Sequence, residues 1–120
     1  MLFRSWGHAR DYVKAMWLML QQDKPDDYVI ASGVECSVRE FVEKCFNKKG
    51  FNIMWKGEGY DEVGYDLNTN RILIRVSKKY FRPSEVDELL GDPTKAKNKL
   101  GWELVETLDT LVDEMLATDC

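Results

Sequence analysis

A short basic segment holds the residue types in this chain that are best suited to binding chemistry. Lys78, Lys79 and Arg82 lie close together in a chain of net charge −4, and Pro83 and then Glu85 come after Arg82. A guanidinium on a segment stiffened by proline can donate two hydrogen bonds to one phosphate, and a nearby carboxylate can accept hydrogen bonds from sugar hydroxyls. The pattern therefore fits the recognition of a nucleotide sugar. The alternative, which composition alone favours, is a solvated basic turn.

The glycines and tyrosines do not form the motifs of a redox active site. Gly57, Gly59 and Gly64 lack the G-x-G-x-x-G spacing and open no recognisable helix, so we predict a plain loop rather than a dinucleotide cradle. None of the five tyrosines is followed four residues later by a lysine, which in a Tyr-x-x-x-Lys pair would lower the pKa of a tyrosine acting as base. We predict no catalytic and no cofactor-binding residue in this chain.

The single histidine and the three cysteines are interpreted as structural. His8 and Asp11 lie one turn apart near a predicted helix start, where we expect a local hydrogen bond rather than an acid/base pair. Cys36, Cys45 and Cys120 are odd in number and lack the spacing of a zinc or disulfide framework. We therefore expect thiols in a reduced compartment and no metal site.

Four segments have the apolar spacing of amphipathic helices. In the first, Val13, Met16, Trp17 and Leu20 form a stripe at i, i+3, i+4 and i+7. The other three begin at residues that can cap a helix, because their side chains accept hydrogen bonds from free backbone N–H groups. The predicted segments are 7–22, 37–50 with Ser37 as cap, 92–101 with Asp92 as cap and Pro93 first, and a last helix from Thr107.

Short β-type runs alternate with these helices. Tyr28–Ala31 is a compact apolar run that suits a buried strand, and 51–56 and 72–76 alternate apolar and polar residues. The stretch between these two strands is rich in Gly and Asn, and we predict a loop there. The result is one α/β domain over residues 1–120, with short strands alternating with helices.

Composition limits the partners. The chain has 120 residues, 44% of them hydrophobic, with 17 basic against 21 acidic side chains. An acidic protein is a poor partner for nucleic acid. No apolar run approaches the roughly 20 residues that span a bilayer, and we find no signal peptide. We therefore expect no nucleic acid, no membrane and a cytoplasmic location.

Four stretches resemble one protein family in the same order. They are 4–13 (RSWGHARDYV), 55–66 (WKGEGYDEVGYD), 80–87 (YFRPSEVD) and 91–102 (GDPTKAKNKLGW). Together they closely resemble the C-terminal region of GDP-mannose 4,6-dehydratases, and the similarity runs from Arg4 nearly to Cys120. The pairing of R-P-x-E-V-D with G-D-x-x-K-A separates this family from other nucleotide-sugar short-chain dehydrogenases.

The resemblance implies roles for three residues. In that family a Rossmann domain holds NADP, and a smaller C-terminal domain closes over GDP-mannose. By resemblance, Arg82 reaches the pyrophosphate, Glu85 the sugar hydroxyls, and Arg4 lies near the nucleotide. Ser5 stands where the family usually has aspartate, which would remove one carboxylate next to Arg4. Asn70 stands at the usual Thr-Gly turn, where asparagine tolerates positive φ.

The resemblance also implies a reaction. NADP takes hydride from C4 of the sugar, water leaves across C5 and C6, and hydride returns at C6. The product is GDP-4-keto-6-deoxymannose, a precursor of GDP-fucose. The Thr/Ser-x-Glu element, the Tyr-x-x-x-Lys pair and the glycine-rich loop that do this precede Arg4 in the family. We therefore expect a truncated substrate-binding domain of the extended short-chain dehydrogenase type, without the Rossmann domain, that binds GDP-mannose, holds no NADP and does not catalyse alone.

Two alternatives stay open. The chain could be a non-catalytic module that captures a GDP-sugar weakly, or docks on an intact dehydratase as a regulatory or decoy subunit, because a site between two domains loses half its walls when one is missing. It could also be purely structural. The face that packs on a Rossmann domain would then pair with another chain, either a Rossmann-containing one or a second copy.

Overall fold

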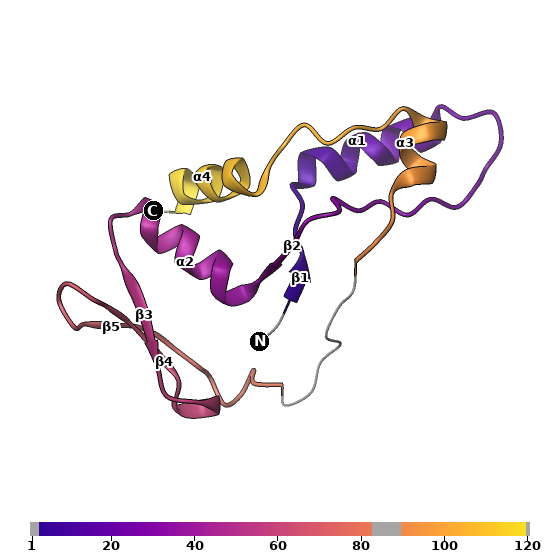
Figure 1. Ribbon diagram of the computed structural model, residues 1–120. Helices are drawn as coiled ribbons and strands as arrows, with labels where there is room; N and C mark the ends of the chain where they lie inside the picture. The colour runs from indigo at the N-terminus through magenta and orange to yellow at the C-terminus, as the bar shows by residue number, and fades with distance from the viewer. Residues whose placement is uncertain (1–2, 83–89, 120) are drawn as a thin grey trace. The chain divides into compact units, whose positions relative to one another are not determined.

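A computed structural model describes residues 3–82 and 90–119 of the chain, and Figure 1 labels its elements. The contacts divide the chain into two compact units, residues 1–38 with 87–120 (unit 1) and residues 39–86 (unit 2). Both combine helices with short antiparallel strands, so the predicted α/β class is confirmed. That the 120 residues form one domain stays a prediction.

Unit 1 contains a two-stranded sheet and three helices. Strands β1 (Phe3–Ser5) and β2 (Glu35–Ser37) pair antiparallel, with Arg4 opposite Cys36. The indole of Trp6 donates to the carbonyl of Cys36 at 2.8 Å, and the backbone N–H of Trp6 donates to the carbonyl of Val34 at 3.3 Å, which continues the pairing beyond the strand. The helices are α1 (Ala9–Leu20), α3 (Thr94–Leu100) and α4 (Leu108–Asp119).

Unit 2 is a helix followed by a three-stranded antiparallel sheet of order β3-β4-β5. Its elements are α2 (Val38–Lys48), β3 (Ile53–Lys56), a 3-10 turn η1 (Gly59–Asp61), β4 (Val63–Asp66) and β5 (Ile72–Arg75).

The helix ends follow the predicted local chemistry. Asp92 accepts the backbone N–H of Thr94 at 3.0 Å, and Thr107 Oγ1 accepts that of Thr110 at 3.1 Å. Gly101 closes α3 in the left-handed conformation, with φ 67°. Because Pro93 lies outside the helix, α3 begins one residue later than predicted.

The strands depart from the prediction in two places. The run Tyr28–Ala31 forms no strand, so that prediction is wrong. Strand β4 lies within the stretch predicted as a loop. The glycine at position 64 interrupts the apolar pattern of this strand. It also leaves room for two neighbours, since a Cβ at Gly64 would lie 2.9 Å from Ile74 Cδ1 and 3.1 Å from Trp55 Cζ3 and these side chains would have to shift. Strands β1 and β2 were also not predicted. Asn70, in the turn to β5, adopts φ 55° as expected.

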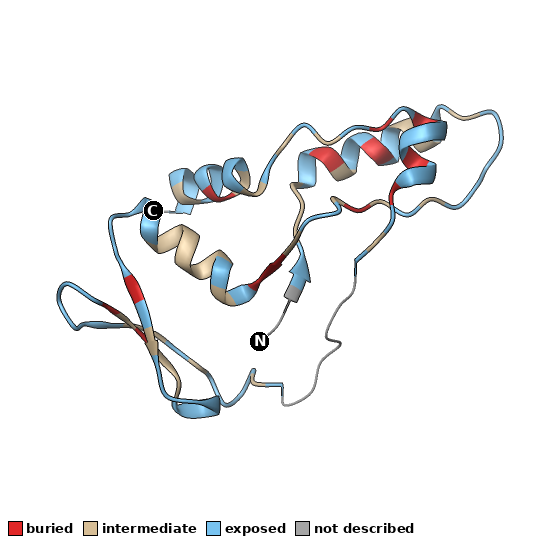
Figure 2. Cartoon of the chain, in the orientation of Figure 1, coloured by how far each residue is buried: buried red, intermediate tan, exposed pale blue. Residues whose placement is uncertain are grey.

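The core of unit 1 lies between α1, α3 and the segment after α3. Ala15, Ala96, Leu100 and Trp102 form the buried cluster, and Figure 2 marks it in red. The indole of Trp102 is fully buried and donates to the carbonyl of Asp11 at 2.9 Å. Tyr12, Leu18, Met19, Tyr28, Ile30 and Leu104 pack around this cluster.

Helix α1 turns an unexpected face to this core. An amphipathic helix ordinarily buries its apolar stripe, but Val13, Met16, Trp17 and Leu20 are all exposed. The fully buried position on α1 is instead Ala15, beside the buried carboxylate of Asp11. Sequence spacing therefore identified the helix and not its buried side.

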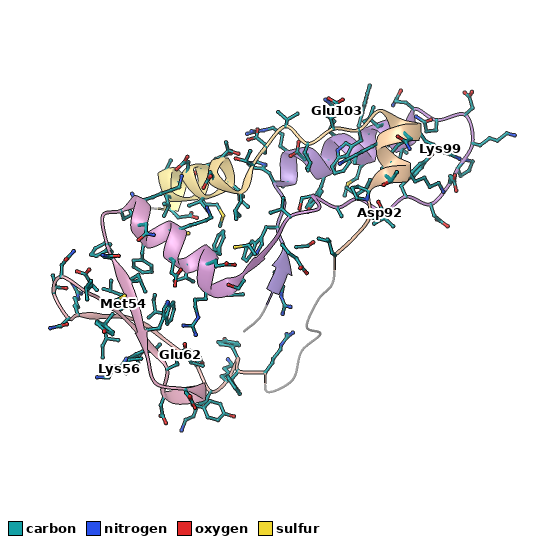
Figure 3. All side chains as sticks on the ribbon, viewed as in Figure 1. Met54, Lys56, Glu62, Asp92, Lys99 and Glu103 are labelled. Carbon is teal, nitrogen blue, oxygen red and sulfur yellow. The ribbon has the colours of Figure 1, made fainter. Side chains whose placement is uncertain are left out.

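In unit 2, the ring of Trp55 on the sheet connects β3 to α2. The guanidinium of Arg39 lies 4.6 Å from the ring centre of Trp55 and pairs with Glu62. The indole nitrogen of Trp55 donates to Glu43 at 2.7 Å. These contacts attach α2 to β3, because Arg39 and Glu43 lie one turn apart on that helix. Met54 and Lys56, which alternate with the inward residues of β3, are exposed (Figure 3).

A buried carboxylate organises the β4–β5 turn. Asp66 accepts the hydroxyl of Thr69 at 2.9 Å and the backbone N–H groups of Asn52 and Asn68. The hydrogen bond from Thr69, followed by those from the backbone, lowers the pKa of Asp66 below its usual 3.8. The turn therefore depends on an ionised aspartate.

Cys36 is buried in β2 and Cys45 is half-buried in α2, and both are thiols, as predicted. Cys120 lies outside the described residues. Within residues 3–82 and 90–119, no helix is long and apolar enough to cross a membrane.

Removing the buried indole of Trp102 should lower the stability of unit 1. We expect Trp102→Ala to lower the free energy of unfolding by about 3–5 kcal/mol, because it opens a cavity in a close-packed core. Trp102→Phe keeps a ring but loses the donor to Asp11, so its free energy of unfolding should lie between those of the unmodified chain and Trp102→Ala. Urea denaturation followed by circular dichroism measures the loss.

The matched control is Trp17→Ala, which removes the same side chain from a position that is 60% exposed. It should change the free energy of unfolding by about 0.5 kcal/mol or less, as surface substitutions usually do. Similar losses in the two alanine variants would contradict this account of the core.

Candidate functional site

Arg4 is presented by the two-stranded sheet of unit 1. It occupies the middle of β1, in register with Cys36 of β2, and it is exposed. The hydrogen bond of the Trp6 indole to Cys36 fixes the strand just beyond it. Ser5, in the position where the resemblance leads us to expect aspartate, pairs in register with Glu35.

Arg82 ends a basic and aromatic segment of unit 2. The ring of Phe81 packs against Tyr60, with centroids 4.5 Å apart. The ammonium of Lys78 lies 5.8 Å from the ring centre of Tyr60, and that of Lys79 lies 5.1 Å from the ring centre of Tyr80. Two of the three cations are thus placed over aromatic rings, where the π face attracts them. Arg82 is exposed at the end of this segment.

The structure does not assemble the three predicted substrate-binding residues. Arg4 belongs to unit 1 and Arg82 to unit 2, and each is described within its own unit. Glu85 lies outside the described residues. The joint role of Arg4, Arg82 and Glu85 in binding stays a prediction.

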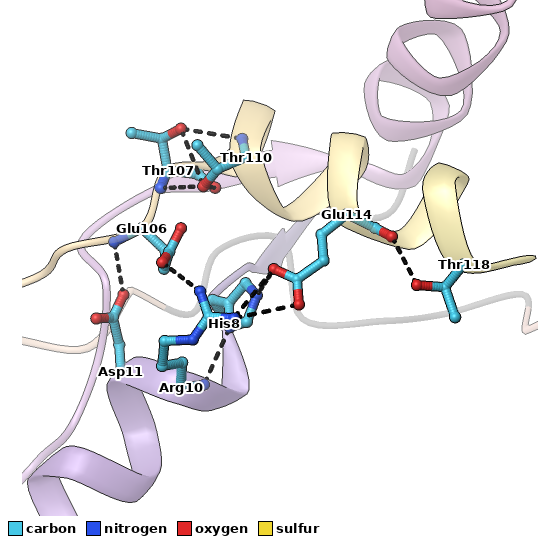
Figure 4. Close-up of polar contacts among 8 residues, drawn as sticks. All are labelled: His8, Arg10, Asp11, Glu106, Thr107, Thr110, Glu114 and Thr118. Carbon is cyan, nitrogen blue, oxygen red and sulfur yellow. Dashed lines mark hydrogen bonds and ion pairs between the residues drawn. The ribbon is translucent and has the colours of Figure 1, made fainter.

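A polar cluster that the sequence did not predict joins the start of α1 to α4 (Figure 4). His8 Nε2 lies 2.8 Å from Glu114 Oε2, and the guanidinium of Arg10 lies 2.6 Å from Glu106 and 3.3 Å from Glu114. His8 Nδ1 accepts the backbone N–H of Arg10 at 3.0 Å and caps α1. Partners more than 90 residues apart in sequence cannot be recognised by spacing.

The predicted hydrogen bond between the side chains of His8 and Asp11 is therefore wrong, although the backbone N–H of Asp11 donates to the carbonyl of His8 at 3.1 Å. Both ring nitrogens of His8 have other partners. The carboxylate of Asp11 instead accepts the backbone N–H groups of Val105 and Glu106, at 3.1 Å each. Each residue is structural, as expected, but through different partners.

The charges of the cluster shift the pKa values of two members. The hydrogen bond to Glu106, and then the charge of Glu114, raise the pKa of Arg10. The hydroxyl of Thr110, followed by Arg10, lowers the pKa of Glu106. Both shifts favour the charged forms of Arg10 and Glu106, and we call the cluster of His8, Arg10, Glu106 and Glu114 the ionic clamp.

A pocket lies beside this cluster in unit 1. Its volume is about 230 Å³, below the roughly 300–1,000 Å³ of ordinary small-molecule pockets. The lining residues are Trp6, Gly7, His8, Ser32, Val34, Leu104, Val105, Glu106, Thr107, Leu108 and Leu111.

The glycines of unit 2 do not form a dinucleotide cradle. Gly57 lies between β3 and the short turn η1, Gly59 is the first residue of η1, and the next element is the antiparallel strand β4. A dinucleotide site needs a strand, a tight turn and then the N-terminus of a helix. The predicted loop is thus confirmed at Gly57, whereas Gly59 begins a 3-10 turn. In the described part of the chain, no three His, Cys, Asp or Glu side chains group as metal ligands would.

Comparison with known proteins identifies relatives along nearly the whole chain. Residues 2–115 match the family model described as GDP-mannose 4,6 dehydratase. The chain is 54% identical to the GDP-mannose 4,6 dehydratase of Dictyostelium discoideum, and 97% of it aligns with 33% of that protein. It is 54% identical to the human GDP-mannose 4,6 dehydratase and 52% identical to the GDP-mannose 4,6-dehydratase of Sinorhizobium fredii, over 31% and 33% of those proteins. The chain thus spans about a third of the length of these relatives.

The ionic clamp should make the stability of unit 1 sensitive to acid. The folded-state pKa of Glu106 lies below its usual 4.5, so its stabilisation is fully present above pH 4.5. That stabilisation is lost as the pH falls through the lowered folded-state pKa. We expect Glu106→Gln to have a lower melting temperature than the unmodified chain at pH 7, and a flatter dependence between pH 4.5 and pH 3.

Melting curves at several pH values test this expectation. Glu103→Gln, a matched change at an exposed carboxylate of the same segment (Figure 3), should retain the acid dependence of the unmodified chain. An equal flattening in both variants would show that general charge, and not the clamp, causes the effect.

Proposed function

This chain belongs to the GDP-mannose 4,6-dehydratase family, and from that premise we propose that it is the nucleotide-sugar-binding part of such an enzyme. The observation that carries the proposal is the family match over residues 2–115, which includes the basic and aromatic segment ending at Arg82. The reaction of the complete enzyme would convert GDP-mannose to GDP-4-keto-6-deoxymannose, the precursor of GDP-fucose.

The binding role is supported by the chemistry of two exposed arginines. A guanidinium can donate two parallel hydrogen bonds to a phosphate, and it is more weakly hydrated than an ammonium group. Arg82 follows Phe81, whose ring is held by Tyr60, so its backbone is anchored on one side. We assign the pyrophosphate to Arg82, the sugar hydroxyls to Glu85, and a place near the nucleotide to Arg4.

Hydride transfer is not assigned to this chain. The family implies NADP, but Gly57 and Gly59 lie between the antiparallel strands β3 and β4, a context that does not fit a dinucleotide. We propose that the cofactor and the catalytic residues belong to the other two thirds of a dehydratase of the relatives' length, in a Rossmann domain of the extended short-chain dehydrogenase type. A cytoplasmic location stays a prediction.

The first test is calorimetric titration of the pure chain with GDP-mannose, and with UDP-glucose for comparison. We expect tighter binding of the GDP-sugar, and a loss of about 10- to 100-fold in Arg82→Ala. This is the range expected when hydrogen bonds to a charged group, worth about 1.5–3 kcal/mol, are removed.

Arg75→Ala is the matched control, because Arg75 is an exposed arginine of β5 in the same unit. It should bind GDP-mannose as the unmodified chain does. Equal weakening in both variants would indicate unspecific attraction of phosphate. No heat with either sugar would contradict a substrate-binding role for the chain alone.

The second test concerns turnover. We expect the pure 120-residue chain with GDP-mannose and NADP to form no GDP-4-keto-6-deoxymannose, because we assign the cofactor and the catalytic residues to the other two thirds of such an enzyme. Product can be followed by nucleotide-sugar chromatography, with an intact family dehydratase as positive control. Product that forms at a rate proportional to the concentration of the pure chain would contradict the proposed division of labour.

A further inference from the structure

The single histidine of the chain caps the helix α1. His8 immediately precedes α1 in an extended conformation, with φ −83° and ψ 135°, and its Nδ1 accepts the backbone N–H of Arg10 at 3.0 Å. The carbonyl of His8 accepts the next two backbone N–H groups, from Asp11 at 3.1 Å and from Tyr12 at 3.4 Å. One residue therefore provides the acceptors for three successive N–H groups at the start of α1.

The two ring contacts of His8 determine where its proton lies. A neutral imidazole has one N–H donor and one nitrogen that accepts. Because Nδ1 accepts from Arg10, the proton belongs on Nε2, which lies 2.8 Å from Glu114 Oε2 and donates to it. Turning the ring over about its Cβ–Cγ bond would put carbon atoms at both contact positions. The neutral form with its proton on Nε2 is thus the one that satisfies both partners.

Proton uptake by this ring would change one of the two contacts and keep the other. Both nitrogens of a protonated imidazole are donors, so Nδ1 would then present an N–H to the N–H of Arg10. The contact with Glu114 would remain, because Nε2 donates in both forms, and it would become an ion pair. Asn, Ser and Thr, which are common at this position of a helix, do not titrate near neutral pH, whereas histidine does.

The charges around the ring can accommodate the added proton. The titratable groups on the elements that meet at His8 are Arg10, Asp11 and Tyr12 of α1, Glu106 of the segment before α4, and Glu114 of α4. The carboxylate of Asp11 is bonded to backbone N–H groups, and Arg10 pairs with both glutamates. One guanidinium and two carboxylates leave one net negative charge beside the neutral ring, and a proton on the ring balances it. The side chain of His8 is 11% exposed, so water can deliver that proton.

We propose that His8 is a proton-operated cap of α1. With its proton on Nε2, the ring binds the N–H of Arg10 and the carboxylate of Glu114, and it ties the start of α1 to α4. When Nδ1 takes up a proton from water, the ring keeps Glu114 and releases the N–H of Arg10, which frees the first turn of α1. That turn directly follows the connection from β1, so the proton acts where the chain leaves the two-stranded sheet. Sugar binding is not needed for this device.

Nitrogen-15 NMR of the chain, prepared without a histidine tag, tests this directly, because His8 is its one histidine. Correlation spectra between ring protons and ring nitrogens show which nitrogen is protonated. We expect the Nε2–H form at about pH 8, and an Arg10 amide signal that moves with the same midpoint as the ring as the pH falls to about 5. The protection of that amide, corrected for its intrinsic exchange rate, should fall about fivefold, the effect of losing one helix cap.

Two variants separate the cap from other titrating groups. In His8→Asn, the side-chain oxygen keeps an acceptor for the N–H of Arg10 but does not titrate, so the Arg10 amide signal should not move over the same pH range. In Glu114→Gln, the ring keeps an acceptor that has no charge, and the Arg10 amide should still follow the ring. The indole N–H of Trp102, which is bonded to Asp11 in the core, should keep its signal throughout and so report that unit 1 stays folded.

Several results would overturn the proposed cap. A proton on Nδ1 at about pH 8, or a ring that takes up no proton above about pH 5, would contradict the two forms assigned to His8. An Arg10 amide that does not follow the ring, or that moves equally in His8→Asn, would show that the ring is not its switch. A Trp102 signal lost at the midpoint of the ring would show that the proton unfolds unit 1 as a whole instead of freeing the start of α1.

Discussion

The fold of unit 1 depends on the buried carboxylate of Asp11. Its two oxygens accept the backbone N–H groups of Val105 and Glu106, and its own carbonyl accepts the indole N–H of Trp102. A buried carboxylate is tolerated only when such donors satisfy it, and a backbone segment without secondary structure needs acceptors for its N–H groups. The carboxylate of Asp11 and the backbone of this segment thus satisfy each other's hydrogen-bonding groups. This exchange ties the first helix of the chain to a segment more than 90 residues later, and α4 follows directly from that segment (Figure 4).

Local chemistry made the helices predictable, whereas the strands and the buried faces depended on partners far along the chain. Asp92, Thr107 and Gly101 act at helix ends through neighbours within four residues, which sequence spacing can reveal. The apolar stripe of α1 has the right period, but a period does not say which of two apolar sides meets the core. Strand β4 was missed because Gly64 weakens the strand pattern, and only the closeness of Trp55 and Ile74 explains it.

The candidate site was predictable only in part, for a similar reason. The basic and aromatic composition around Arg82 is local, and the structure places two of its lysines over tyrosine rings. The roles assigned to Arg4 and Glu85 came from resemblance, because no spacing rule connects positions so far apart in sequence. The clamp of His8, Arg10, Glu106 and Glu114 was missed because its two halves lie at opposite ends of the chain. The misassigned pairing of His8 with Asp11 shows how a plausible local contact loses to long-range partners that satisfy both groups.

The position of Arg4 connects the proposed sugar site with the first helix. Arg4 lies in β1, and only Ser5 to His8 separate it from the first residue of α1. Two of these four residues are held by hydrogen bonds, since the indole of Trp6 donates to the carbonyl of Cys36 and His8 Nε2 lies 2.8 Å from Glu114 Oε2. Residues far from Arg4 in the sequence therefore restrict where the arginine that we assign to the nucleotide can lie within unit 1.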